Sequence, residues 1–178
     1  MFKLKSTKIG ILGGSFDPAH KGHLTFSKIA LKKIKLKKIY WVVTKKNPFK
    51  EKTFFSLKDR IDKAKKISSK IKNIEVLYID DVIKSSKSIK VIQYILKKKK
   101  PKDLYFIVGS DILLKFHRWH SWKRIVKLTK LIVYSRKGYD RKSKKTIVVK
   151  YLNKNNITFI NNKPIEVSSS FLRKRVKI

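Results

Sequence analysis

The stretch "GILGGSFDPAHKGHL" (residues 10–24) joins the end of an apolar run to a Gly-Gly pair and to two of the four histidines in the chain. The apolar run predicts a buried β-strand, and the residues from His23 onward carry apolar side chains at helical spacing. A helix that begins directly after such a strand points its first backbone N–H groups and the positive end of its dipole at one space. The stretch therefore predicts a phosphate-binding site within an α/β unit.

The rest of the chain repeats this alternation of short apolar runs with longer, lysine-rich amphipathic segments. The predicted strands are 8–12, 39–43, 74–79, 103–108, 131–135 and 157–160, and the predicted helices are 23–36, 56–71, 88–100 and 146–154. Several strands are apolar throughout, which is typical of strands covered on both faces. The pattern predicts an α/β fold, a parallel sheet with helices on both faces. The length fits one domain, residues 1–178.

The composition narrows the class of protein. A formal net charge of +37 invites a nucleic-acid-binding interpretation, but only seven of the 48 cationic residues are arginine, and the lysines occur in nearly every segment. Base readout and bidentate phosphate binding favour arginine, so the pattern disfavours nucleic acid as a partner. Because the chain has no cysteine, no signal-peptide pattern and no apolar stretch of membrane-spanning length, we expect a cytoplasmic protein outside the membrane.

The two histidines of the opening stretch suit phosphate chemistry. His20 and His23 stand three residues apart at a helix start, so they share one face, from which each donates to phosphate oxygens and carries charge as phosphoryl bonds break. The stretch lacks both the G-x-G-x-x-G fingerprint and the G-K-[ST] ending of a P-loop. A metal site is the alternative, but zinc would need a third ligand, and Asp17 is the only acid nearby.

Together with later motifs, this stretch resembles the nucleotidylyltransferase superfamily, whose members carry an H-x-G-H signature in a Rossmann-like, doubly wound domain. Within it, the segments "FIVGSDILLKFHRWHSW" (106–122), "LIVYSRKGY" (131–139) and "VSSSFLRKR" (167–175) are similar to motifs of bacterial nicotinate mononucleotide adenylyltransferases. "NPFK" (47–50) stands where the family has a P-P-H-K-like loop. The resemblance covers residues 8 to about 177.

The resemblance implies a set of site residues. His20, His23 and Arg173 would be catalytic. The residues that would bind ATP are Gly13, Gly14, Ser15, Phe16, His20, His23, Gly109, Asp111, Ser168, Ser169, Ser170 and Arg173. The residues that would bind the second substrate are Lys50, Ser88, Trp119 and Arg136. No metal ligand in the chain is expected, and Mg²⁺ would enter with ATP.

Several of these residues have a structural alternative. Asp111 could cap the helix that follows it instead of holding the nucleotide. Trp119 could be a core side chain instead of a ring that stacks on a pyridine. Arg136 could pair with a nicotinate carboxylate or with the mononucleotide phosphate. Two departures from the family pattern, Lys87 where the family often has tyrosine and Phe49 in place of a loop histidine, put single substrate contacts in doubt.

The implied reaction is transfer of AMP from ATP to nicotinate mononucleotide, giving deamido-NAD and pyrophosphate. The attacking phosphate oxygen is already ionised at neutral pH, since the second pKa of a phosphomonoester is ~6, so no general base is required. The close alternative is phosphopantetheine adenylyltransferase, which shares the early motif and a serine-rich end. A more remote alternative is a non-catalytic nucleotide- or RNA-binding module. The sequence is compatible with a homo-oligomer.

Overall fold

The computed structural model describes residues 7–45 and 52–161 together with Ser169 and Leu172. Its strands are β1 (Lys8–Gly14), β2 (Lys38–Val43), β3 (Ile74–Leu77), β4 (Asp103–Gly109), β5 (Lys130–Tyr134) and β6 (Ile157–Ile160). Its α-helices are α1 (Lys21–Ile34), α2 (Leu57–Ser68), α3 (Ser88–Lys99), α4 (Ser110–Leu113), α5 (Trp122–Leu128), α6 (Asp140–Ser143) and α7 (Ile147–Tyr151). Two short 3₁₀ turns, η1 (Phe116–Arg118) and η2 (Lys154–Asn156), complete the elements. All six predicted strands are confirmed.

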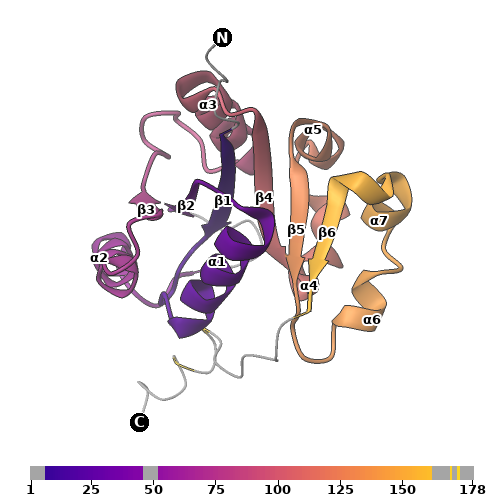
Figure 1. The fold of residues 1–178 in the computed structure, drawn as a ribbon. Coiled ribbons are helices and arrows are strands. Elements are labelled where there is room, and N and C mark those ends of the chain that lie inside the picture. The colour runs from indigo at the N-terminus through magenta and orange to yellow at the C-terminus, as the bar shows by residue number, and fades with distance from the viewer. Residues whose placement is uncertain (1–6, 46–51, 162–168, 170–171, 173–178) are drawn as a thin grey trace.

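The strands form one parallel sheet in the order β3-β2-β1-β4-β5-β6 (Figure 1). The chain builds outward from β1 through β2 to β3, and then returns to the other side of β1 to build β4, β5 and β6. The order therefore reverses between β1 and β4, and open parallel sheets bind ligands beyond the carboxyl ends of the strands at such a point. The prediction of a doubly wound, Rossmann-like fold is confirmed.

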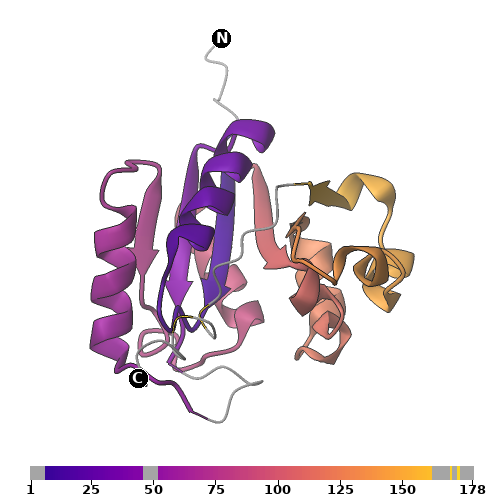
Figure 2. The same ribbon diagram turned by 90° about the horizontal axis from the view of Figure 1, so that it is seen from below.

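Both faces of the sheet are buried, which explains the continuous apolar strands. Along β4, Phe106 and Val108 face one hydrophobic core and Tyr105 and Ile107 face the other. The first core also takes in residues of α3, α4, α5 and α7, whereas α1 and α2 cover the second (Figures 1 and 2). Because successive strand residues alternate between faces, each strand needs apolar side chains at nearly every position.

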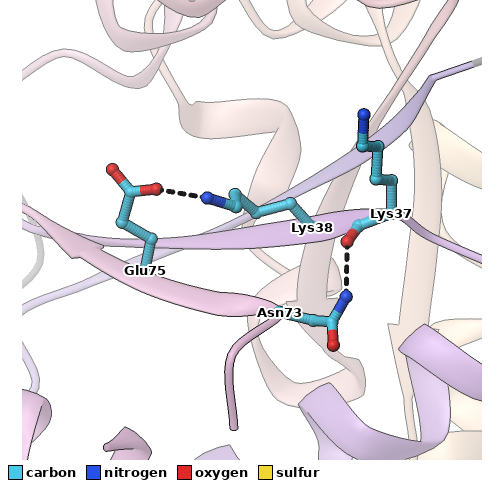
Figure 3. Close-up of polar contacts among 4 residues, drawn as sticks. All are labelled: Lys37, Lys38, Asn73 and Glu75. Atoms are coloured by element: carbon cyan, nitrogen blue, oxygen red, sulfur yellow. Dashed lines mark hydrogen bonds and ion pairs between the residues drawn. The ribbon is translucent and has the colours of Figure 1, made fainter.

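Polar contacts fix the register of β3, the edge strand beside β2. The Lys38 ammonium lies 2.7 Å from Glu75 Oε2, and the Asn73 side-chain amide donates to the Lys37 carbonyl at 2.8 Å (Figure 3). The ion pair is partly exposed, so its contribution to stability is small. It pairs opposite charges across neighbouring strands and thereby disfavours a slipped register.

The helices differ more from the expectation than the strands do. The helix expected over 146–154 is only α7, with η2 after it, and α4, α5 and α6 were not predicted. These three helices have four, seven and four residues, which is too short for a helical repeat to show in the sequence. In the described part of the chain no helix has the length and apolar character needed to cross a membrane.

Candidate active site

A cavity of about 680 Å³ opens at the carboxyl ends of β1 and β4, where the strand order reverses. Its wall includes most of the described residues that the sequence predicted for binding. These are Gly13, Gly14, Ser15, Phe16, His23, Ser88, Gly109, Asp111, Trp119, Arg136 and Ser169. His20 is buried against His23, with 3.9 Å between the ring centroids. Lys50, Ser168, Ser170 and Arg173, like Phe49, lie outside the described residues.

The two histidines cap the start of α1 by a reciprocal pair of hydrogen bonds. The Gly22 N–H donates to His20 Nδ1 at 3.1 Å, and the His20 N–H donates to His23 Nδ1 at 3.2 Å. Each Nδ1 is therefore an acceptor and carries no proton, which places the proton of each neutral ring on Nε2. The helix cap thus fixes both the orientation of the rings and the nitrogen that donates to a ligand.

The charge state of His20 differs from the expectation. Burial, and secondarily the nearby Arg136 guanidinium, lower the pKa of His20 from 6.5 to about 4. The ring is therefore neutral at physiological pH, so it acts as a hydrogen-bond donor and not as a cation. Its Nε2 is buried and has no hydrogen-bond partner among the described residues.

Aromatic side chains hold His23 from behind. The Phe16 ring lies 4.9 Å from His23, and Trp41 lies 6.0 Å from it with its edge turned to the imidazole. Trp41 is itself fixed by a 2.8 Å hydrogen bond from its indole N–H to Ser27 on α1. The ring of His23 is thus packed on one side while it lines the cavity on the other.

The chain turns into the site at Phe16, and the Gly-Gly pair before it belongs to β1. Gly13 and Gly14 are the last two residues of β1, and Phe16 is the residue with a positive φ, +46°. A Cβ on either glycine would meet its nearest protein atoms at an ordinary 3.9 Å. The protein itself would accommodate a side chain there, so the two glycines leave open space for a ligand.

Asp17 is a structural carboxylate and not a catalytic or metal-binding one. It is 1% exposed, and its two oxygens accept hydrogen bonds of 2.9 Å from the backbone N–H groups of Phe54 and Phe55. The acid next to the histidines therefore anchors the loop that leads into α2. The alternative of a His-x-x-His metal site completed by Asp17 has no support in this geometry.

The turn after β4 presents Asp111 to the cavity. The residue is the second of α4, which begins after Gly109 without a side-chain cap, so the capping alternative is wrong. The Oδ1 atom of Asp111 is buried and has no hydrogen-bond partner in the described part of the chain. A Cβ on Gly109 would lie 2.2 Å from this oxygen and 3.1 Å from the Tyr134 ring. Gly109 thus leaves room for the Asp111 carboxylate.

Trp119 and Arg136 are placed by packing on one side and face the cavity on the other. The Trp119 ring stacks on Phe116 at 5.0 Å, is half-buried and lines the cavity, so its packing in the core is confirmed and its binding role stays a prediction. The Arg136 guanidinium lies 5.4 Å from the Tyr134 ring and 5.8 Å from the Phe26 ring. Its positive charge contributes, after burial, to the lowered pKa of His20, and the residue lines the cavity.

Asp140 supports Arg136 from outside the cavity. Its carboxylate accepts from the Arg136 N–H at 3.1 Å and from the Ser135 hydroxyl, and the Arg136 N–H also lies 2.9 Å from Ser110 Oγ. Burial raises the pKa of Asp140, but the hydrogen bonds from Ser135, Ser110 and Arg136 outweigh it and lower the pKa overall. The turn after β4 and the end of β5 are thereby joined.

Sequence reasoning missed part of the wall. The additional polar or aromatic lining residues are Thr44, Ser86, Lys87, Phe106, Arg118, His120 and Tyr134. Thr44 directly follows β2, Lys87 is the N-cap of α3 and Tyr134 ends β5. A place at the carboxyl edge of the sheet is the signal that could have found these three. Among the described lining residues Asp111 is the one acid, against several cationic or protonatable side chains, so the cavity suits a polyanion.

The serine-rich segment near the end of the chain meets the opening motif. Ser169 donates from Oγ to the Pro18 carbonyl at 3.0 Å, across 151 residues of sequence, and it also lines the cavity. Residues of both segments are expected to bind ATP, and Ser169 is the described residue of the second segment that contacts the first. A glycine-ended first strand, paired histidines at a helix start and a serine from the far end of the chain together define a nucleotidyltransferase-type site.

Comparison with known proteins identifies the family. Residues 11–175 match the cytidylyltransferase-like family model, and the chain belongs to this family. A relative from Pelagibacter ubique, "Probable nicotinate-nucleotide adenylyltransferase", is 50% identical over 170 residues, which cover 96% of this chain and 94% of the relative. A relative of the same name from Aquifex aeolicus is 35% identical, with 90% of this chain and 98% of the relative covered.

Solved structures agree on the fold. A Plasmodium falciparum nicotinic acid mononucleotide adenylyltransferase complexed with NaAD has a TM-score of 0.69 at 22% identity, covering 94% of this chain and 83% of that one. A putative nicotinate-nucleotide adenylyltransferase from Vibrio parahaemolyticus has a TM-score of 0.63 at 14% identity, covering 76% and 78%.

Gly109→Ala is expected to weaken nucleotide binding by about tenfold, because the new methyl group displaces the Asp111 carboxylate. Titration of the variant with an ATP analogue measures the effect, and circular dichroism checks the fold. The control is the double variant with Asp111→Ala. If the methyl group acts through Asp111, Gly109→Ala costs little further affinity in that background. Equal losses in both backgrounds would contradict this account.

His20→Asn is expected to reduce the loss of folding stability as the pH falls. The pKa of His20 is 6.5 when unfolded and about 4 when folded, so the unfolded state takes up the proton first. The contribution of neutral His20 is complete above pH 6.5 and is lost as the pH falls toward 4. Asparagine keeps the N-cap acceptor but does not titrate.

The measurement is the thermal midpoint at several pH values in that window. We expect the fall of the midpoint with acid to be smaller by about 5 °C in His20→Asn than in the unmodified protein. The exposed His120, changed to asparagine, serves as the control and should retain the original slope. The account of His20 fails if the two variants behave alike.

Proposed function

We propose that this protein transfers AMP from ATP to nicotinate mononucleotide, giving deamido-NAD and pyrophosphate. The observation that carries the type of reaction is the pair of Nε2–H donors that the helix cap fixes at the switch point of the sheet. The choice of acceptor rests on the relatives, which bear the name nicotinate-nucleotide adenylyltransferase at up to 50% identity over nearly the whole chain.

The site performs the transfer by positioning and charge neutralisation. An oxygen of the acceptor phosphate attacks the α-phosphorus of ATP in line, while the bond from that phosphorus to the leaving pyrophosphate breaks. The attacking oxygen needs no base, because its phosphate is already ionised. The Nε2–H groups of His20 and His23 and the guanidinium of Arg136 stabilise the charge on the phosphates. Arg173 and Lys50 are proposed to add charge from outside the described residues.

The residues present fit a Mg²⁺ ion that enters with ATP. Mg²⁺ binds one or two carboxylates together with substrate phosphates and retains water ligands, so a cage of several protein ligands is not needed. Asp111 offers a buried carboxylate oxygen that has no hydrogen-bond partner in the described part of the chain. The ion would supply neutralisation of phosphate charge. Asp111 is proposed to bind either this ion or the ribose.

The acceptor subsite is proposed to lie between α3 and Trp119. Ser88, with Lys87 before it, stands at the start of α3 and lines the cavity, as Trp119 does. An aromatic face suits a flat, electron-poor pyridine. A single cytoplasmic domain acting on ATP and nicotinate mononucleotide remains our proposal for the cellular setting, and assembly into a homo-oligomer is compatible with it.

The decisive experiment incubates the protein with Mg-ATP and, separately, with nicotinate mononucleotide, nicotinamide mononucleotide or phosphopantetheine, and measures pyrophosphate. Release with nicotinate mononucleotide, and with nicotinamide mononucleotide at least about tenfold less efficiently, is expected. Release with phosphopantetheine alone would overturn the substrate and retain the mechanism. No release with any acceptor, together with salt-dependent RNA binding, would favour the non-catalytic module.

His23→Ala is expected to lower kcat by about 100- to 1,000-fold, the usual cost of removing a preorganised donor to a developing anion. Pyrophosphate release under saturating substrates gives kcat, and circular dichroism checks that the helices survive the loss of the His23 half of the α1 cap. Lys33→Ala, on the last turn of α1, is the matched control and should keep normal turnover. Near-normal turnover in His23→Ala would contradict the proposed mechanism.

A further inference from the structure

Arg60, which sequence analysis did not select, is a buried charge next to the site. It belongs to α2 and is 1% exposed. Lysine or arginine is almost never fully buried unless it is paired, because removal of a charge from water is costly. Burial lowers the pKa of Arg60, and the charges of Asp17 and Asp80 oppose that shift. The buried guanidinium of Arg60 offers hydrogen-bond donors, which an apolar side chain does not.

The hydrogen bonds of Arg60 go to the main chain at the rim of the cavity. Its Nη1 donates to the Ser15 carbonyl at 2.7 Å and to the Thr44 carbonyl at 2.8 Å. Ser15 and Thr44 follow β1 and β2 and both line the cavity. The Thr44 N–H also donates to the Gly14 carbonyl at 2.9 Å, so the two rims are joined directly as well. One guanidinium nitrogen thus holds the ends of two neighbouring strands.

Two buried carboxylates complete what we call the Arg60 cluster, which consists of Asp17, Arg60 and Asp80. Asp80, 4% exposed, accepts from the Thr44 hydroxyl at 2.9 Å and from the Lys45 N–H at 2.8 Å. Asp17 holds the loop before α2, as described above. The segments that follow β1, β2 and β3 and the segment that precedes α2 therefore converge on one cluster of charges.

A short path of contacts leads from Arg60 to the histidines. The Ser15 carbonyl belongs to the peptide bond before Phe16, and Phe16 has the left-handed φ of +46° that turns the chain into the site. Non-glycine residues hold such a conformation only when their surroundings impose it. Arg60 fixes the peptide before Phe16, and Asp17 fixes the residue after it. The Phe16 ring in turn packs on His23.

We propose that Arg60 is a positioning residue for nucleotide binding. Its guanidinium holds the Ser15–Phe16 peptide and the Thr44 carbonyl so that Phe16 supports His23 in its place at the cavity. The inference rests on the proposed function only in that the ligand is ATP. Lysine would not replace arginine here, because both hydrogen bonds come from the terminal Nη1 of the guanidinium and the lysine side chain is shorter and ends in a more strongly hydrated ammonium.

The test compares Arg60→Met and Arg60→Lys with Ser68→Ala. Ser68 lies on the same helix, is 4% exposed and donates to the Ala64 carbonyl at 2.9 Å, so it controls for loss of a buried polar contact in α2. Binding of a non-hydrolysable ATP analogue, kcat and KM for ATP, and the thermal midpoint are measured for each variant. All kinetic assays are run well below the lowest midpoint, so that every variant is folded.

We expect both Arg60 variants to lose at least tenfold in kcat/KM for ATP and in analogue affinity, with Ser68→Ala within twofold of the unmodified protein. A lower midpoint with unchanged affinity and kcat/KM in the Arg60 variants would overturn the proposal and leave a purely structural role. Should Arg60→Met not fold, Arg60→Lys decides, because it retains the charge. Analogue binding needs no acceptor, so this result is independent of whether nicotinate mononucleotide is the second substrate.

Discussion

The two hydrogen bonds that the His20 and His23 rings accept, from the Gly22 N–H and the His20 N–H, are the interaction on which the site depends. They cap α1, orient two imidazoles and assign the proton of each to Nε2. A helix start needs its free N–H groups satisfied, and here the groups that satisfy two of them are the reactive side chains themselves. The same hydrogen bonds that begin the helix therefore also orient the two imidazole rings. Because His20 is neutral, its one ring proton stays on Nε2.

The position of this cap follows from the sheet. A parallel sheet buried on both faces leaves its carboxyl edge as the place where backbone and polar side chains can meet a ligand. The order β3-β2-β1-β4-β5-β6 separates the loops after β1 and β4 at that edge, and the cavity lies there. On the side of the cavity toward β3, the loops are held by hydrogen bonds of Asp17, Arg60 and Asp80. On the side toward β5, they are held by Asp140. Asp17, Arg60 and Asp80 are buried and do not belong to the cavity wall.

The sequence predicted the strands and helices that carry a long apolar pattern, and the residues that belong to motifs of the family. The six strands, the long helices and the meeting of Ser169 with the opening motif were available from apolar runs and from resemblance to the family. The short helices α4, α5 and α6 were not, because fewer than eight residues carry no readable period. The neutrality of His20 depends on burial and, secondarily, on the charge of Arg136, a residue 116 positions away, so it could not be read locally. Arg60 was missed for the same reason, since in sequence it is one more cation in a lysine-rich amphipathic helix.

The roles of the acids show why composition near a motif is a poor guide to catalysis. Asp17, the acid closest to the histidines in sequence, turns both carboxylate oxygens to backbone N–H groups. Asp111, far away in sequence, lines the cavity and has one buried oxygen without a hydrogen-bond partner in the described part of the chain. A reaction whose nucleophile arrives ionised has no use for a general base beside the histidines. It does need rigid donors and a loop that holds them, and a carboxylate that accepts two backbone hydrogen bonds contributes to such a loop. The acid in the motif therefore serves the same end as Arg60: it keeps the main chain before His20 in one conformation.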